Sequence, residues 1–251
     1  LLLEPAGTST LTLSNFIGNQ TFTRVDFGNV GGGTMTANNV ASAVTDIRLI
    51  EGVTGDTVVF DRLVDNTTNT VAISARNTAL QTITAATLND EEFVTYSSVN
   101  AAADVTITML NAADLLTLTV SGEGDLIVTN AITSTLVRTV DASATTGAVT
   151  ILASNAVVAT TATAGSGVFT FTGGALADSI TGGTAADILS GGNGADVINS
   201  GTGNDNTTGG NGADVINVGS GTDTLTLGAD AQSAVSTRTT AATANTIDLT
   251  G

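Results

Sequence analysis

Six aspartates recur at every ninth position near the C-terminal end of the chain, within consecutive nonamers that begin at Gly173. The nonamers read GGALADSIT, GGTAADILS, GGNGADVIN, SGTGNDNTT, GGNGADVIN and VGSGTDTLT. The sixth place of each nonamer holds Asp178, Asp187, Asp196, Asp205, Asp214 and Asp223. Carboxylate oxygens suit calcium, and the pattern G-G-x-G-x-D-x-U-x, with U a large apolar residue, is typical of calcium-binding parallel β-rolls. These residues could therefore hold several calcium ions.

The nine-residue spacing predicts how the aspartates are positioned. Each nonamer is expected to form a six-residue turn and a three-residue strand, and two nonamers complete one coil of a roll. Aspartates two nonamers apart then stack on one edge, where strands lie about 4.8 Å apart. Two calcium–oxygen bonds of about 2.4 Å span that distance. The predicted bridging pairs are Asp178 with Asp196, Asp187 with Asp205, Asp196 with Asp214, and Asp205 with Asp223.

Turn carbonyls are expected to complete the six to eight oxygens that calcium takes. The glycines allow positive φ, which aims those carbonyls inward. The candidate main-chain ligands lie at Gly182, Thr184, Gly191, Asn193, Gly209 and Asn211. Several residues depart from the pattern: Leu176 and Ala185 at position four, Ser200 and Val218 at position one, and Thr207 at the apolar position. The best sites are therefore expected around Asp196, Asp205 and Asp214.

The other positions of the nonamers predict a core and a junction. The eighth positions are expected to fill the core, with Ile180, Leu189, Ile198, Ile216 and Leu225. Residues 164–172 keep the same rhythm but carry Phe169 where an aspartate would stand. This stretch is predicted to be a metal-free coil that joins the nonamers to the preceding chain.

Acidic residues elsewhere give weaker signals. Asp56 and Asp125 follow glycine-containing turns and precede strands, so each is a possible additional metal ligand, although such turns are more often only solvated. Glu91 and Glu92, which follow Asp90, are interpreted as a solvated corner rather than a catalytic pair.

Short β-rich segments recur upstream of the nonamers, at 47–50, 57–60, 70–73, 93–96, 105–109, 115–120, 126–129, 136–140 and 148–152. Similar passages begin at Ile47, Phe93 and Leu136, which implies a doubled coil of about 22 residues. The predicted fold is all-β, a right-handed parallel β-solenoid that ends in a calcium-binding β-roll. Its predicted parts are a β-rich cap or subdomain over 1–45, a Thr/Ala-rich solenoid over 46–172, the roll over 173–226, and a cap or next segment over 227–251.

Composition narrows the function. The net charge of −17 argues against nucleic acid and anionic membranes as partners. Histidine, cysteine and lysine are absent, which excludes Ser-His-Asp, Cys-His and HExxH catalysis and a lysine-containing phosphate loop. Two carboxylates could still hydrolyse a glycan, but the expectation is that the chain is not an enzyme. No apolar stretch is long enough to span a bilayer, and both ends are expected to be cuts through, or processing of, a longer polypeptide.

The nonamers GGNGADVIN at Gly191 and Gly209 resemble those of RTX proteins, which bacteria secrete through type I machinery. The resemblance implies a roll that stays unfolded at low cytoplasmic calcium and folds outside the cell. Because calcium neutralises stacked carboxylates that otherwise repel, and binding to the folded state alone stabilises it, chelation is expected to collapse the strands over residues 173–226.

The passages LLTLTVSGEGDLIVTN and LVRTVDASATTGAVTIL resemble bacterial surface-layer (S-layer) proteins of the Caulobacter type. This resemblance implies a structural subunit that assembles with copies of itself into a calcium-dependent lattice on the bacterial cell surface. Cell-surface polysaccharide or lipopolysaccharide is a further expected partner. The alternative is a calcium-stiffened segment of a large type I-secreted adhesin or another exported RTX protein.

Overall fold

The computed structural model describes most of the chain after residue 22, and two short segments before it. The described residues are 2–3, 9–12, 23–27, 33–41, 44–49, 54–62, 67–76, 80–228, 234–236 and 246–248. Regular structure within these ranges is entirely β-strand, with no helix. The chain is therefore all-β, as predicted.

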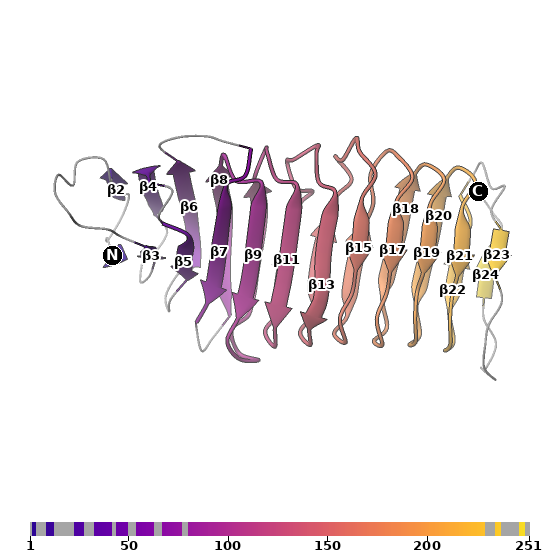
Figure 1. Cartoon of the computed structure of the whole chain (residues 1–251). Coiled ribbons are helices and arrows are strands. Elements are labelled where there is room, and N and C mark those ends of the chain that lie inside the picture. The colour runs from indigo at the N-terminus through magenta and orange to yellow at the C-terminus, as the bar shows by residue number, and fades with distance from the viewer. Residues whose placement is uncertain are drawn as a thin grey trace.

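The strands alternate between two parallel sheets as the chain advances (Figure 1). The first sheet contains β1 (Leu2–Leu3), β3 (Arg24–Phe27), β5 (Asp46–Leu49), β7 (Thr70–Ala75), β9 (Phe93–Ser98), β11 (Thr117–Gly122), β13 (Thr139–Thr145), β15 (Thr161–Thr163), β17 (Ser179–Thr181), β19 (Val197–Asn199), β21 (Val215–Asn217) and β23 (Ala234–Ser236). The second contains β2 (Ser9–Thr12), β4 (Thr34–Val40), β6 (Thr54–Arg62), β8 (Gln81–Asn89), β10 (Val105–Asn111), β12 (Leu126–Val128), β14 (Val149–Leu152), β16 (Phe169–Thr172), β18 (Ile188–Asn193), β20 (Asn206–Asn211), β22 (Thr224–Thr226) and β24 (Thr246–Asp248). Each strand pairs with the strand two places along the chain, which is the topology of a β-solenoid.

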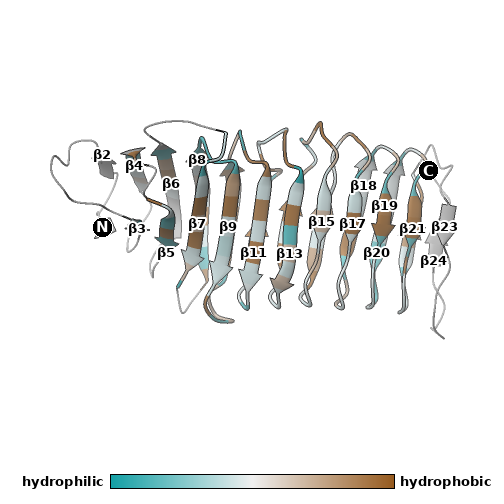
Figure 2. Cartoon of the chain, in the orientation of Figure 1, coloured by the Kyte–Doolittle hydropathy of each residue, from teal (hydrophilic) through white to brown (hydrophobic). Residues whose placement is uncertain are grey.

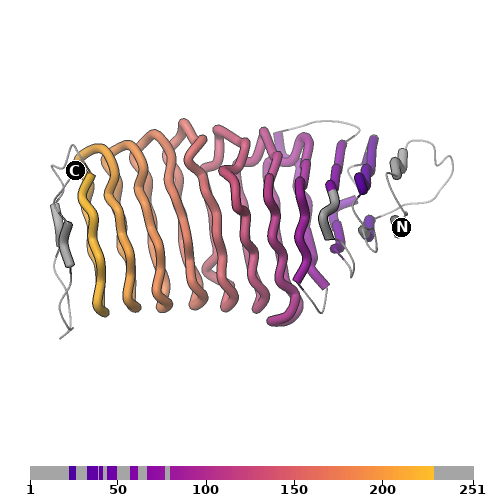
Figure 3. Tube along the Cα trace, turned by 180° about the vertical axis from the view of Figure 1, so that it is seen from behind, coloured from indigo at the N-terminus to yellow at the C-terminus, as the bar shows by residue number. Residues whose placement is uncertain are grey.

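The register gives the length of each coil. Thr117 pairs with Thr139, and Thr139 pairs with Thr161, which is the coil length expected from the similar passages. In the nonamer region the coil is shorter, because Val197 pairs with Val215 and hydrogen-bonded aspartates of adjacent coils are 18 positions apart. Figure 3 shows the resulting coils stacked side by side along the axis of the solenoid. The predicted change from the longer coil to a coil of two nonamers is confirmed.

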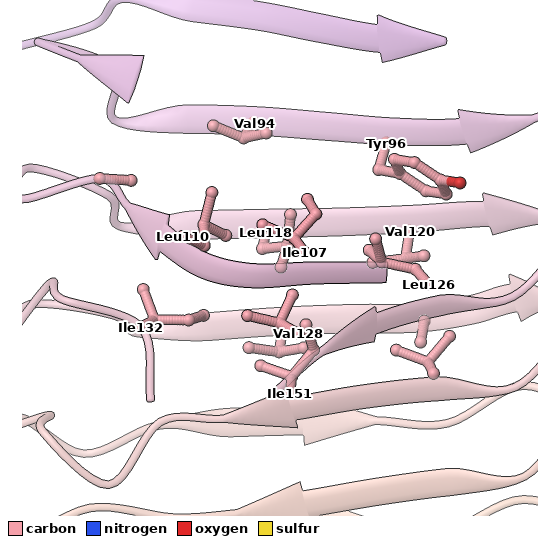
Figure 4. Close-up of a cluster of buried hydrophobic side chains, with 14 of the residues drawn as sticks. Val94, Tyr96, Ile107, Leu110, Leu118, Val120, Leu126, Val128, Ile132 and Ile151 are labelled. Carbon is pink, nitrogen blue, oxygen red and sulfur yellow. The ribbon is translucent and has the colours of Figure 1, made fainter. Parts of the chain in front are cut away.

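The core is a thin layer between the two sheets. Alternate residues of each strand point inward, as in the exposed–buried alternation of β17 and β21. The close-up in Figure 4 shows Val94, Tyr96 and Leu118 of one sheet facing the same interior as Ile107 and Val128 of the other. Figure 2 shows apolar segments, in brown, within neighbouring strands such as β7, β9 and β11. A narrow interior of this kind suits small and β-branched side chains, which the composition supplies.

The structure agrees with the expected strands and adds two within the solenoid predicted over 46–172. All nine expected segments overlap observed strands, whereas β8, with the sequence QTITAATLN, and β15, with the sequence TAT, are not among them. The similar passages that begin at Ile47, Phe93 and Leu136 supply β5, β9 and β13 of one sheet. Consecutive passages are two coils apart in this sheet, which explains why their spacing in the sequence is twice the coil length.

The predicted domain boundaries and the right-handed winding stay predictions. The strands described before residue 45 pair within the same two sheets as the later ones. Within the described part of the chain, no helix could cross a membrane.

Candidate metal centre

The nonamer aspartates form two columns, one on each edge of the solenoid. Each residue of the first column directly precedes a strand of one sheet, and each residue of the second directly precedes a strand of the other. The first column is Asp178, Asp196 and Asp214, and the second is Asp187, Asp205 and Asp223. All six are buried, with at most 2% of their surface exposed. Burial of that many carboxylates requires compensation by hydrogen bonds or by cations.

Main-chain amides supply part of that compensation. Asp196 Oδ1 accepts a hydrogen bond from Asp178 N at 2.7 Å, and Asp205 Oδ1 accepts one from Asp187 N at 2.8 Å. Asp214 Oδ1 and Asp223 Oδ1 accept equivalent bonds of 3.0 Å from the aspartates one coil earlier. The two aspartates of each predicted pair therefore lie in adjacent coils. A hydrogen bond joins them directly, from the main-chain amide of the earlier residue to the carboxylate of the later one.

Two carboxylate oxygens in the middle of the columns lack such a bond. Asp196 Oδ2 and Asp205 Oδ2 are buried and have no hydrogen-bond partner. A buried anionic oxygen without a donor is costly, and a divalent cation removes that cost. These two atoms fit calcium, which binds carboxylate oxygen in preference to nitrogen or sulfur.

The same two residues show the electrostatic consequence. Burial raises the pKa of Asp196 to about 6, and repulsion from Asp178 and Asp214 adds to that rise. Burial likewise raises the pKa of Asp205 to about 6, with further repulsion from neighbouring aspartates. Both groups are thus destabilised as anions in the absence of a cation, and a bound calcium would favour their charged form.

Left-handed glycines shape the turns that carry these aspartates. Gly192 and Gly194 have φ of 100° and 127°, and Gly210 and Gly212, one coil later, have 105° and 126°. An ideal Cβ on Gly191 would fall against both Asp196 Oδ2 and the carbonyl oxygen of Gly209. The absence of that Cβ leaves a space between a carboxylate oxygen and a carbonyl oxygen of the next coil, which is a cradle for a cation.

The candidate main-chain ligands fall into two groups. Gly182, Gly191 and Gly209 are buried, and a Cβ on each would meet Oδ2 of the aspartate in its own turn. Thr184, Asn193 and Asn211 lie on the exposed side of their turns. The side-chain Nδ2 of Asn211 donates to Asn193 Oδ1 at 2.8 Å, and the main-chain carbonyl of Asn211 accepts from Gly194 N at 2.8 Å.

No group of three or more carboxylates converges within the described residues. A cation between two stacked aspartates would therefore take its remaining oxygens from the main chain or from water.

The family model of the RTX calcium-binding nonapeptide repeat (4 copies) matches residues 172–206 and 208–231. This segment carries RTX repeats. Comparisons with curated proteins and with solved structures found no match.

RTX repeats bind calcium within a β-roll, and they are typical of proteins that bacteria secrete through type I machinery. Their presence indicates a calcium-binding, exported protein. The RTX β-solenoid is a structural calcium-binding fold.

In the coil before the RTX repeats, the main-chain amides that donate to the first two aspartates belong to residues other than aspartate. Phe169 N donates to Asp187 Oδ1 at 2.8 Å, and Thr160 N donates to Asp178 Oδ1 at 2.6 Å. Phe169 itself is buried and stacks on Phe171, with ring centroids 5.6 Å apart. An apolar residue thus replaces the aspartate at this edge, in agreement with a joining coil.

The irregular RTX repeat at residues 200–208 contains a relationship that sequence reasoning missed. Ser200 and Thr207 both depart from the consensus. In the structure their hydroxyl oxygens lie 2.7 Å apart, and both residues are fully buried. The signal was the co-occurrence of two polar departures in one nonamer.

The possible additional ligands lie outside the aspartate columns or outside the described side chains. Asp125 Oδ1 accepts a hydrogen bond from Ala148 N at 2.6 Å. Leu126, the next residue, pairs with Val149, and Val149 pairs with Phe169, which stands one coil before Asp187. Leu126, and not Asp125, is therefore in line with the second aspartate column. Calcium binding at Asp125 stays a prediction. Asp56 lies within β6, but its side chain is outside the described part of the structure.

The interpretation of Glu91 and Glu92 as a solvated corner is wrong. Glu91 is fully buried and Glu92 is 6% exposed. Glu92 Oε2 accepts a hydrogen bond from Asn69 N at 2.8 Å, and the Asn69 side chain donates to the Asp90 carbonyl at 2.7 Å. The corner therefore packs against the preceding coil, and Glu92 holds the start of β7 in place.

Proposed function

We propose that this protein is a structural subunit of a bacterial surface layer, which folds and assembles in a calcium-dependent way. The observation that carries the proposal is the continuous pair of twelve-stranded parallel sheets with calcium-binding RTX repeats in its later coils. Such a solenoid is a stiff building block whose coils contact only their neighbours. Calcium outside the cell would complete its fold where the layer is needed.

Exposed apolar side chains on the RTX coils support association between copies. Val197 and Val215 are paired neighbours on one sheet and are 51% and 45% exposed. Ile188, on the other sheet, is 50% exposed. Apolar groups that lie side by side on a surface favour burial against a partner.

The charge supports calcium as the bridge in a layer. A chain with a net charge of −17 repels its own copies, and divalent cations reduce that repulsion. The same cations could connect the surface to acidic cell-surface polysaccharide or lipopolysaccharide, which we propose as the second partner.

Electron microscopy of the purified protein before and after addition of millimolar calcium tests this function. A surface-layer subunit is expected to form two-dimensional sheets, which chelation dissolves. The alternative, a calcium-stiffened segment of an exported adhesin, predicts a folded monomer at high protein concentration in the same calcium. Sedimentation that shows only this monomer would contradict the surface-layer role and support the alternative.

A further inference from the structure

The first RTX turn differs from those in the middle of the roll, because its aspartate is fully bonded to the main chain. Asp178 Oδ1 accepts from Thr160 N at 2.6 Å, and Asp178 Oδ2 accepts from Gly174 N at 2.8 Å. Gly174 does not have positive φ. Both carboxylate oxygens of this turn are thus satisfied by amides alone, without a cation.

The second turn, on the opposite edge, repeats this arrangement. Asp187 Oδ1 accepts from Phe169 N at 2.8 Å, and Asp187 Oδ2 accepts from Gly183 N at 2.7 Å. Gly183 also lacks positive φ. Two turns on two edges therefore share one closed geometry, in which the amide at position two donates to the aspartate.

The third and fourth turns have an open geometry. Gly192 and Gly201, at position two, have φ of 100° and 95°. In the same turns Asp196 Oδ2 and Asp205 Oδ2 have no hydrogen-bond partner. The left-handed conformation at position two thus coincides with loss of the amide that closes the first two turns.

The residue at position four of each nonamer explains which turns have the open geometry. Gly194 and Gly203 have φ of 127° and 135°, a region that residues with a Cβ rarely adopt. The first two turns carry Leu176 and Ala185 at this position, and neither has positive φ. A side chain at position four therefore keeps the turn closed.

We infer that only two of the four stacked pairs, Asp196 with Asp214 and Asp205 with Asp223, hold calcium. The coil formed by residues 173–190 is instead closed by amides and is part of the calcium-independent solenoid. It is the template on which residues 191–228 fold when calcium binds. This inference narrows the expected collapse on chelation from the whole of residues 173–226 to the later coils, and it does not depend on the surface-layer role.

Two matched double variants test the inference through the number of calcium ions bound per chain, measured by native mass spectrometry. Asp196→Asn with Asp205→Asn removes one carboxylate from each proposed site, so this variant is expected to bind two fewer ions than the unaltered protein. Asp178→Asn with Asp187→Asn is expected to bind the same number. Loss of four ions from the first variant, or of any ion from the second, would overturn the inference.

Hydrogen exchange on the unaltered protein gives a test that needs no variant to fold. In excess EDTA, the amides of residues 173–190 are expected to stay protected, as are those of residues 139–172, while those of residues 191–228 exchange freely. Exchange of residues 173–190 as fast as residues 191–228 would show that the first coil also depends on calcium, which contradicts the template.

Discussion

Ser200 Oγ and Thr207 Oγ1 lie 2.7 Å apart in the interior of the roll, and both side chains are fully buried. They are the two departures from the consensus within one RTX repeat. A buried hydroxyl without a hydrogen-bond partner destabilises the folded state. Each of these two hydroxyls supplies the partner that the other needs, so the two polar residues are tolerated together.

A double-mutant cycle tests this coupling. Ser200→Ala and Thr207→Val each leave one hydroxyl without its partner and are expected to destabilise the protein by about 1–3 kcal/mol. The double variant should lose clearly less stability than the sum of the two single losses, with a coupling of about 1 kcal/mol. Denaturant unfolding in saturating calcium measures each term, and strict additivity would show that the hydroxyls do not stabilise one another.

Gly212→Ala is expected to weaken calcium binding. Gly212 has φ of 126°, and an added Cβ would meet the carbonyl oxygen of Gly194 in the preceding coil. Strain of this kind costs about 1–3 kcal/mol, and a clash with the main chain adds to it. Calorimetric titration should show an affinity at least about tenfold lower. The matched control is Ala213→Ser on the exposed side of the same turn, for which no change is expected.

Phe169→Ala tests the junction between the calcium-independent coils and the RTX repeats. Phe169 is buried and stacked on Phe171, so its truncation is expected to cost about 3–5 kcal/mol in calcium and in EDTA alike. Val168→Ala is the control, because Val168 is 41% exposed. A loss that appeared only in calcium would place the effect at the metal rather than in the core.

The raised pKa values predict an unusual pH dependence in EDTA. Burial holds the pKa of Asp196 and Asp205 at about 6, above the ordinary value of 3.8, so the folded state binds more protons than the unfolded state between these values. Stability contributed by these groups is therefore full below about pH 4 and is lost as the pH rises to about 6. Thermal melts at successive pH values should show that decline, and the Asp196→Asn, Asp205→Asn variant should reduce it. A rise in stability over this window that the variant leaves unchanged would contradict the assignment.

Much of the fold could be predicted from the sequence, because the repeats determine the coil length. A fixed spacing of nine residues places Asp196 against Asp178, and the similar passages at Ile47, Phe93 and Leu136 mark every second coil. Strand β8 was missed because QTITAATLN has few large apolar residues, and only its neighbours β6 and β10 define it as a strand.

The local departures were harder to predict, because they depend on contacts between coils. Glu91 and Glu92 have the composition of a solvated corner, and only the approach of Asn69 from the preceding coil explains their burial. Leu176 and Ala185 were visible as substitutions for glycine, but the sequence did not show that their turns close on amides. That closure became apparent only from the bonds of Gly174 and Gly183.

Calcium binding and folding of the later RTX coils are expected to be coupled. The most direct measurement is the melting temperature of these coils as a function of free calcium, with magnesium titrated in parallel. A ligand that binds only the folded state stabilises it by about 4 kcal/mol per site at a thousand times its dissociation constant. We therefore predict a melting temperature that climbs steadily with the logarithm of calcium concentration and responds much less to magnesium. The same melting temperature in excess EDTA and in millimolar calcium would contradict this coupling.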